Sequence, residues 1–550
     1  MAYDGYSQLK VLVIDDFDNF RMTICRMLQE LGVEDVETAV NGAQAVRFSR
    51  RRSFDMILCD YNLGSGKNGQ QVLEELRVNK ILKHRCLFVL ISAETSRSMI
   101  MATYDYEPDA YLTKPITSNI LRQRLDRLLR QRQELLPIYD ALDEDALDKA
   151  INLCRTCIDS DSRYTSQCQK LLGNLYLQTG ALAEAETLYR KVLEVRALDW
   201  AQVGLAKVKQ AQGEFQMADK WLREIIVNNP LCMQAYDVLA ENCKKLGDDD
   251  QLQTVLHRAV EISPMSLVRQ LHLAQTAVDN NDLITAANAW RRAVRLGQFS
   301  CRDKLENHLN FARTAAALFN EDVQLAQDLS RDALRVLSEI PQRFEMTSEV
   351  EAQALLVESQ VLAGQGQKSK AEEILREVES TVGEEPAGLS IDTQLDQVVA
   401  LKALKKDIPA KKRLDDIIER YREDEKALVK IDRLLEEPLS EHNRQRVAKL
   451  NRGGIGLYEQ GRYKDAIDAF KQAKRLFPNH LGVHLNLVQA LLGEMEEFGR
   501  DEGYMDLCLA TLKKVGCRVT TGHAQYKRYL QLQDKVKNLG LKQEGTRDVE

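Results

Sequence analysis

The chain has 550 residues, of which 44% are hydrophobic and 29% charged, and its formal net charge is −7. This length exceeds what one hydrophobic core usually supports, so we expect two or more domains. The acidic balance gives no basic footprint for nucleic acid, and neither a signal-peptide core nor a run of about 18 apolar residues is present. We therefore expect a folded cytoplasmic protein that binds no nucleic acid and enters no membrane.

Residues 9–130 alternate short apolar runs with amphipathic helical patterns. Most of the apolar runs are continuous, as is typical of strands buried on both faces of a parallel sheet. The alternation predicts a doubly wound α/β domain of the flavodoxin type. The predicted strands are 10–14, 36–40, 56–59, 87–91 and 110–112, with helices between them, for example over 19–31, 70–78 and 119–132.

After Pro137 the strand patterns stop and a helical repeat begins. Pro230 and Pro264 are 34 positions apart, as are Gly213 and Gly247. Apolar positions fall in the same register: Leu205, Leu239 and Leu273; Leu222, Leu256 and Trp290; Ile225, Ala259 and Ala293. This period and pattern resemble the tetratricopeptide repeat, which implies an all-α solenoid of helix pairs.

The repeat pattern defines the expected domain organisation. It is regular over 166–299, weaker over 351–380, and returns over 447–480. We expect an α/β domain over 1–130, connecting helices over 131–165, repeats over 166–380, a break at the glycine- and proline-containing 381–390, long helices over 391–446, and a C-terminal repeat-like region over 447–550.

One segment of the long-helix region repeats every seven residues. Leu414, Tyr421, Leu428 and Leu435 have this spacing. It fits either a coiled-coil face that would form a homodimer or a solenoid helix that packs on its neighbours, and the sequence leaves both open.

Chemically distinctive side chains follow four of the predicted strands. Asp15 and Asp16 follow the first strand, Asp60 the third, Ser92 the fourth and Lys114 the fifth. The carboxyl ends of parallel strands meet at one sheet edge, so we expect these side chains to lie together. Three carboxylates repel one another unless a cation is present, and oxygen ligands suit Mg²⁺. A bound metal would leave Asp60 free to act as a nucleophile toward a phosphoryl group.

With these residues in this order, the region 9–130 resembles the receiver domain of two-component response regulators. The resemblance implies that Asp60 is the phosphoacceptor, that Asp16 binds Mg²⁺ directly and Asp15 largely through water, and that Asn62 contributes its backbone carbonyl. It also implies that Ser92 and Lys114 contact the phosphoryl group and that Tyr111 is the switch aromatic. Asn62 and Glu94 hold the two positions that tune dephosphorylation in this family. The loop YNLGSGKNG after Cys59 and Asp60 departs from the family by lacking its usual Met-Pro pair.

The resemblance also implies a function. A bacterial sensor histidine kinase or a phosphotransfer protein would phosphorylate Asp60, and the receiver would shift between two states. We expect the repeats to bind a protein partner, and we place the partner groove at Lys170, Asn174, Lys207, Gln210, Glu241 and Lys244. The alternatives are a DNA-binding transcription regulator and a phosphate sink with little output of its own. We see no enzyme motif, so we expect no catalysis beyond self-phosphorylation and autodephosphorylation at Asp60.

Overall fold

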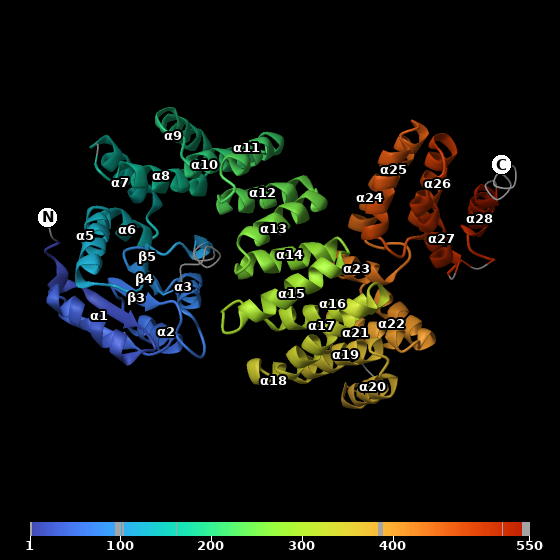
Figure 1. Cartoon of the computed structure of the whole chain (residues 1–550), viewed down its shortest axis with the longest axis horizontal. Helices are drawn as coiled ribbons and strands as arrows, with labels where there is room; N and C mark the ends of the chain where they lie inside the picture. The colour runs from blue at the N-terminus through green and yellow to red at the C-terminus, as the bar shows by residue number, and fades with distance from the viewer. Residues whose placement is uncertain are drawn as a thin grey trace, which may run out of the picture. The chain divides into compact units, whose positions relative to one another are not determined.

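A computed structural model of the chain describes residues 3–93, 101, 104–160, 162–382, 389–516, 518–519 and 521–541. The chain divides into two compact units, one of Met1–Thr276 with Thr285–Asn307 and one of Ala277–Ile284 with His308–Glu550. The first contains an N-terminal α/β domain followed by helices, and the described part of the second is helical (Figure 1). The predicted fold class is therefore confirmed.

The α/β domain is built on one parallel five-stranded sheet of order β2-β1-β3-β4-β5. Its strands are β1 Lys10–Ile14, β2 Asp35–Ala39, β3 Met56–Asp60, β4 Leu87–Ser92 and β5 Ala110–Thr113. Every predicted strand is present, with its bounds shifted by about one residue at most, within the usual uncertainty of such bounds. The strand order reverses between β1 and β3, and ligands of such sheets bind at the carboxyl ends next to this reversal.

Alternate residues of each strand enter two cores on opposite faces of the sheet. Val11 and Val13 of β1 face the first and last helices of the domain, whereas Leu12 and Ile14 face the second and third. Both faces are therefore covered, which explains the continuous apolar runs. The helices are α1 Asp18–Glu30, α2 Gly42–Arg51, α3 Gly69–Val78 and α5 Ser118–Glu134, and two short 3-10 turns are η1 Tyr6–Gln8 and η2 Tyr104–Tyr106.

The connection to the helical region is short. Helix α5 ends at Glu134, and α6 (Leu136–Asp143) begins after the single residue Leu135. The Leu135 side chain is fully buried in the first helical core. No flexible tether therefore separates the two regions.

Helix pairs with the predicted register complete the first unit. Its further helices are α7 Leu147–Asp159, α8 Thr165–Thr179, α9 Leu182–Val195, α10 Asp199–Ala211, α11 Phe215–Asn228, α12 Met233–Leu246, α13 Asp249–Ile262, α14 Leu267–Asp279 and α15 Leu283–Gly297. The three apolar sets that repeat every 34 residues are all buried. A Cβ at Gly173 would lie 2.5 Å from Tyr189 Oη, and one at Gly204 would lie 2.3 Å from Tyr189 Cζ. Small residues on α8 and α10 thus make room for one large ring from α9.

The second unit continues with helices of similar length. They are α16 Leu305–Ala317, α17 Val323–Ser338, α18 Ile340–Arg343, α19 Ser348–Gly364, α20 Lys368–Val382, α21 Ile391–Ala403, α22 Asp407–Arg420, α23 Glu425–Ile431, α24 Glu441–Glu459, α25 Tyr463–Leu476, α26 Leu481–Phe498, α27 Glu502–Gly516 and α28 Tyr526–Leu541, with short turns η3 Leu318–Asn320 and η5 Asp432–Leu434. Of the predicted break at 381–390, positions 383–388 lie outside the described residues. Among the helices above, none has the length and apolar character needed to cross a bilayer.

The structure differs from the expected long helices over 391–446. Helix α22 ends at Arg420, and α23 begins only at Glu425 because Asp424 caps it by accepting hydrogen bonds from its first amides. Leu414 and Leu428 are buried in the core of their own unit. The seven-residue spacing therefore does not lie on one continuous helix, and the helices pack on their neighbours instead of presenting a coiled-coil face.

Candidate functional site

Three carboxylates gather at the carboxyl ends of β1 and β3. Asp15 and Asp16 follow β1, and Asp60 is the last residue of β3. Each can place one oxygen so that all three oxygens lie within 4.8 Å of one another. Asp15 and Asp60 are only 1% and 5% exposed, whereas Asp16 lies at the open side of the cluster. The structure thus brings together the side chains that the sequence predicted.

Lys114 enters the cluster from the end of β5. Its Nζ lies 2.9 Å from Asp60 Oδ1 and 3.0 Å from Asp15 Oδ2. The ammonium group also lies over the ring of Phe20, at 3.9 Å from the ring centroid. The peptide bond between Lys114 and Pro115 is cis. The lysine is therefore held at the acidic edge by two carboxylates and an aromatic face.

Burial and charge oppose each other at the two central groups. Burial raises the pKa of Asp60, and the hydrogen bond from Lys114 offsets part of this rise. Burial lowers the pKa of Lys114, but its hydrogen bonds to Asp60 and Asp15 outweigh that effect, so the Lys114 pKa is raised overall. Lys114 stays protonated at neutral pH and supplies a fixed positive charge beside Asp60.

The donor set fits a hard divalent cation. All three ligand candidates offer carboxylate oxygens, which Mg²⁺ prefers. Asp16 Oδ1 is buried and has no hydrogen-bond donor among the described residues, so it can still accept a bond from a cation. Asn62 is exposed in the following loop, where its side chain accepts a weak 3.4 Å hydrogen bond from the Gly64 amide.

The glycine-rich loop after β3 has a structural explanation that sequence reasoning missed. Gly64 and Gly66 adopt positive φ angles of 69° and 111°. Gly69 begins α3, and a Cβ there would lie 2.2 Å from the backbone oxygen of Asp60. The sequence signals only the start of α3, where Asn68 and Gln71 form a capping box, and carries no signal for the close approach at Gly69. The loop therefore returns tightly against the phosphoacceptor candidate.

Ser92, Tyr111 and Glu94 are the other residues to which the family resemblance assigns a role. Ser92 ends β4 and is 4% exposed, and the Lys114 amide donates to its backbone carbonyl at 2.8 Å. Tyr111 on β5 is partly buried against the core that contains α2 and α3. Glu94, the second predicted tuning position, lies outside the described residues. The assigned roles of these residues stay predictions.

The six groove positions lie on α8, α10 and α12, the first helix of each pair. The side-chain amide of Gln210 is hydrogen-bonded within the solenoid, where it donates to the Val238 carbonyl at 3.0 Å and to Asn242 Oδ1 at 3.3 Å. Lys170 forms a 3.7 Å ion pair with Glu107 of the α/β domain. The other four, Asn174, Lys207, Glu241 and Lys244, are exposed or half-buried.

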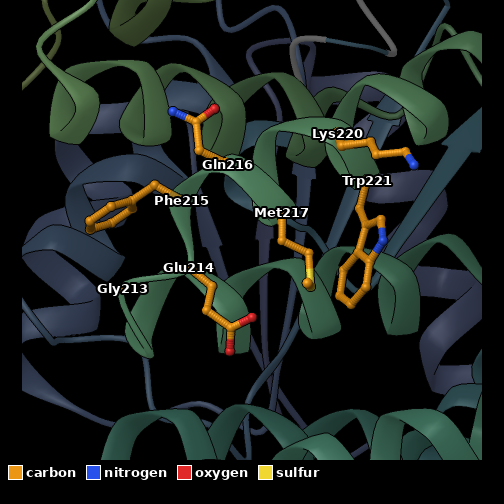
Figure 2. A pocket seen from close by; sticks show the side chains of 7 residues that line it. All are labelled: Gly213, Glu214, Phe215, Gln216, Met217, Lys220 and Trp221. Carbon is orange, nitrogen blue, oxygen red and sulfur yellow. The ribbon is translucent and has the colours of Figure 1, made fainter.

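A pocket of about 560 Å³ lies at the turn between α10 and α11. Figure 2 shows Met217 and Trp221 side by side among its lining residues, with Glu214 and Lys220 nearby. All seven lining residues come from one short stretch, Gly213 to Trp221. It lacks the convergent polar groups of a catalytic site.

Comparisons with known proteins agree with this geometry. The response regulator receiver domain family matches residues 11–126, and tetratricopeptide repeat families match residues 165–197 and 448–498. Chemotaxis protein CheY-3 of Vibrio cholerae is 28% identical over 123 residues, which are 22% of this chain and 93% of that protein. Chemotaxis protein CheY of Pseudomonas aeruginosa is 27% identical over 22% of this chain and 98% of its own length.

Solved structures match a similar share of the chain. The Vibrio cholerae chemotaxis protein CheY4 is 26% identical over 22% of this chain and 98% of its own, with a TM-score of 0.21. The receiver domain of a Pseudomonas aeruginosa sensor histidine kinase, which has a magnesium ion coordinated in its active site cleft, is 25% identical over 22% of this chain and 96% of its own, with a TM-score of 0.20.

Proposed function

We propose that this chain, which carries an N-terminal response regulator receiver domain followed by tetratricopeptide repeats, is a phosphorylation-gated regulator that controls protein binding by its repeats. The observation that carries the proposal is the cluster of Asp15, Asp16 and Asp60, with Lys114 paired to Asp15 and Asp60. A three-carboxylate cluster with one lysine in contact suits the transfer of a phosphoryl group better than any other chemistry of these groups. The similarity to chemotaxis receivers supports the same site.

The proposed reaction is the transfer of a phosphoryl group from a phosphohistidine of a kinase or phosphotransfer protein. An Asp60 carboxylate oxygen attacks the phosphorus, an acyl phosphate forms, and the phosphorus–nitrogen bond breaks with the electron pair going to the imidazole. Asp15 and Asp16 would hold Mg²⁺ beside Asp60, and the ion would neutralise the phosphoryl oxygens. Lys114 keeps its charge next to Asp60 and would pair with one of those oxygens.

The proposed output is a change in protein binding. Phosphorylation converts a singly charged carboxylate into a doubly charged acyl phosphate, so it adds about one negative charge, together with three phosphoryl oxygens, at a buried edge of the sheet. Repeat solenoids present extended surfaces that suit protein partners. We place the chain in the bacterial cytoplasm, with no nucleic acid among its partners and no enzymatic activity beyond reactions at Asp60.

Labelling by a small phosphodonor tests this proposal. With acetyl phosphate and Mg²⁺, the wild-type chain should gain the mass of one phosphoryl group, and Asp60→Asn should gain none. Asp55→Asn is the matched control, because Asp55 precedes the opposite, amino end of β3. Equal labelling of wild type and Asp60→Asn would remove the site assignment and the function with it.

A further inference from the structure

Glu74 is buried by partners that come largely from outside the receiver domain. It lies on α3 and is 2% exposed. Its Oε1 accepts hydrogen bonds from Tyr106 Oη at 2.7 Å and Arg302 Nε at 2.8 Å, and its Oε2 accepts one from Ser300 Oγ at 2.6 Å. Ser300 and Arg302 follow α15, more than 220 residues later in the chain. A buried carboxylate is costly unless it is paired, and here the repeats supply the pairing.

Asp105 forms a second contact of the same kind. Its Oδ1 lies 2.7 Å from Nη1 of Arg269 on α14, and both side chains are below 10% exposed. The other edge of the Arg269 guanidinium binds both oxygens of Asp237 on α12, at 2.8 Å each. Arg269 is therefore fixed by a repeat residue through Nε and Nη2, and its Nη1 faces Asp105 of the receiver.

The third contact caps the end of a helix. Gln71 Nε2 donates to the carbonyls of Leu296 at 3.2 Å and Gln298 at 2.9 Å, and Lys67 Nζ donates to the Phe299 carbonyl at 2.9 Å. These carbonyls lie at the carboxyl end of α15, where a helix leaves its acceptors unpaired and favours positive charge.

These contacts define two complementary surfaces within the first unit. We call the repeat surface the dock and the receiver surface the lock. The dock consists of Asp237, Arg269, Ser300, Arg302 and the carbonyls of 296, 298 and 299, and the lock consists of Lys67, Gln71, Glu74 and Asp105. The side-chain donors of the dock meet carboxylates, so the dock is chemically selective for acidic side chains. At its rim, Glu107 pairs with Lys170 and accepts from Gln234 at 3.1 Å.

Three of the four lock residues, Lys67, Gln71 and Glu74, lie on the segment that directly follows the phosphoacceptor candidate. The loop that leaves Asp60 carries Lys67, and Gly69 then passes so close to the Asp60 carbonyl that no Cβ fits between them. Gln71 and Glu74 follow on the first two turns of α3. A rearrangement around Asp60 would therefore act on the loop that positions Lys67, Gln71 and Glu74.

We propose that the dock is the output-binding surface of the repeats, that it takes an acidic segment of a partner protein, and that Glu74 and Asp105 occupy it until Asp60 is phosphorylated. This inference rests on the proposed function and names the partner chemistry and the regulation of that site. The receiver thus acts as an internal competitor, and phosphorylation releases Arg269, Ser300 and Arg302 from its carboxylates so that they can bind external ones.

Two double variants of the full chain separate opening from binding. Glu74→Ala with Asp105→Ala removes the lock and leaves the dock intact, whereas Arg269→Ala with Arg302→Ala removes the dock. Arg292→Ala, an exposed α15 arginine, is the control. Amide hydrogen exchange at 298–302 should be slow in the unphosphorylated wild type and in the control. It should be at least about tenfold faster in both double variants and in wild type loaded with beryllofluoride and Mg²⁺.

A fluorescent hexaglutamate peptide tests the partner chemistry. At low salt it should bind at least about tenfold more tightly to the lock variant than to unphosphorylated wild type, and binding should weaken as salt is raised. It should not bind the dock variant, although that variant is also open.

The outcomes discriminate between the two proposals. Slow amide hydrogen exchange at 298–302 in both double variants would overturn the proposal that the lock residues cover the dock. Equal peptide binding by the lock and dock variants would overturn the acidic-partner assignment. If the lock variant opens and binds peptide but beryllofluoride opens nothing, the dock and its partner chemistry stand, and the phosphorylation gating of the proposed function fails.

Discussion

Asp16 differs from its two neighbouring site carboxylates because it has a buried oxygen without a donor in the described part of the chain. Lys114 already pairs with Asp15 and Asp60, so Asp16 has the most charge left to offer a cation. At the residue scale this makes Asp16 the side chain on which metal binding should depend most strongly.

We predict that Asp16→Asn weakens Mg²⁺ binding by at least about tenfold, since an amide replaces a charged ligand. The measurement is the Mg²⁺ concentration that gives half-maximal labelling by acetyl phosphate. Asp4→Asn, at an exposed acid near the N-terminus, should leave that concentration unchanged. An unchanged Mg²⁺ requirement in Asp16→Asn would rule out Asp16 as a ligand.

The positions of site residues that follow predicted strands could be predicted from the sequence. The roles of residues that depend on tertiary packing could not. The acidic pair, Asp60 and Lys114 lie at the carboxyl ends of β1, β3 and β5, which a parallel sheet brings to one edge. Gly69 has no such pattern, because its need for a missing Cβ comes from the later approach of the Asp60 carbonyl. Lys170 was assigned to an external partner, yet it pairs with Glu107 of the same chain.

At the scale of helices, adjacent glycines on α24 offer a matched test of repeat packing. A Cβ at Gly454 would lie 2.6 Å from Phe470 Cε1, whereas one at Gly453 would meet nothing within 4 Å. We predict that Gly454→Ala lowers the free energy of unfolding of the second unit by about 1 to 3 kcal/mol through overpacking. Gly453→Ala should raise it by about 0.5 to 1 kcal/mol, since alanine favours an exposed helix. Urea titration of both variants measures the difference, and equal effects would contradict the packing of Phe470 on Gly454.

His484 makes the stability of the second unit depend on pH. Burial lowers its pKa to about 4, and its Nε2 lies 2.9 Å from the Pro478 carbonyl, to which the neutral ring donates. The unfolded chain binds a proton on His484 more readily than the folded chain does. The stability that neutral His484 contributes is therefore complete above the unfolded pKa near 6.5 and is lost as the pH falls toward 4.

We predict that His484→Gln reduces the loss of unfolding free energy between pH 7.5 and pH 5.5 by about 1 kcal/mol. Glutamine can still donate to Pro478 and does not titrate. The exposed His442→Gln on α24 serves as control and should keep the wild-type pH dependence. A His484→Gln variant with the wild-type dependence would show that His484 is not the titrating group.

Local periodicity made the helix pairs predictable and could not reveal how they end or what they contact. Gly213 and Gly247 both adopt positive φ, and Asn281, the next position in the 34-residue register, does so without being glycine. The seven-residue spacing over 414–435 was real, but the Asp424 cap interrupts it. Glu74 lies on an amphipathic helix where an acid is ordinarily exposed, so no local pattern indicated its burial by Ser300 and Arg302.

At the scale of the first unit, two routes could carry a change at Asp60 to the repeats. One is covalent, through α5 and the buried Leu135 into α6. The other is the contact between lock and dock, which joins residues far apart in sequence. The covalent route requires a rigid junction between α5 and α6. The contact route requires only that the chain keeps the lock and the dock linked.

We predict that four Gly-Ser residues inserted between the exposed Gln133 and Glu134 leave the signal largely intact. A short flexible loop costs about 1 kcal/mol of closure entropy or less, so the lock stays at a high effective concentration near the dock. Beryllofluoride should still accelerate exchange at 298–302, with the response reduced by no more than about fivefold. The same insertion combined with Glu74→Ala and Asp105→Ala should exchange rapidly with or without beryllofluoride. If the insertion alone abolishes the response while 298–302 stays protected, the rigid α5–α6 junction carries the signal and the docked surface only follows it.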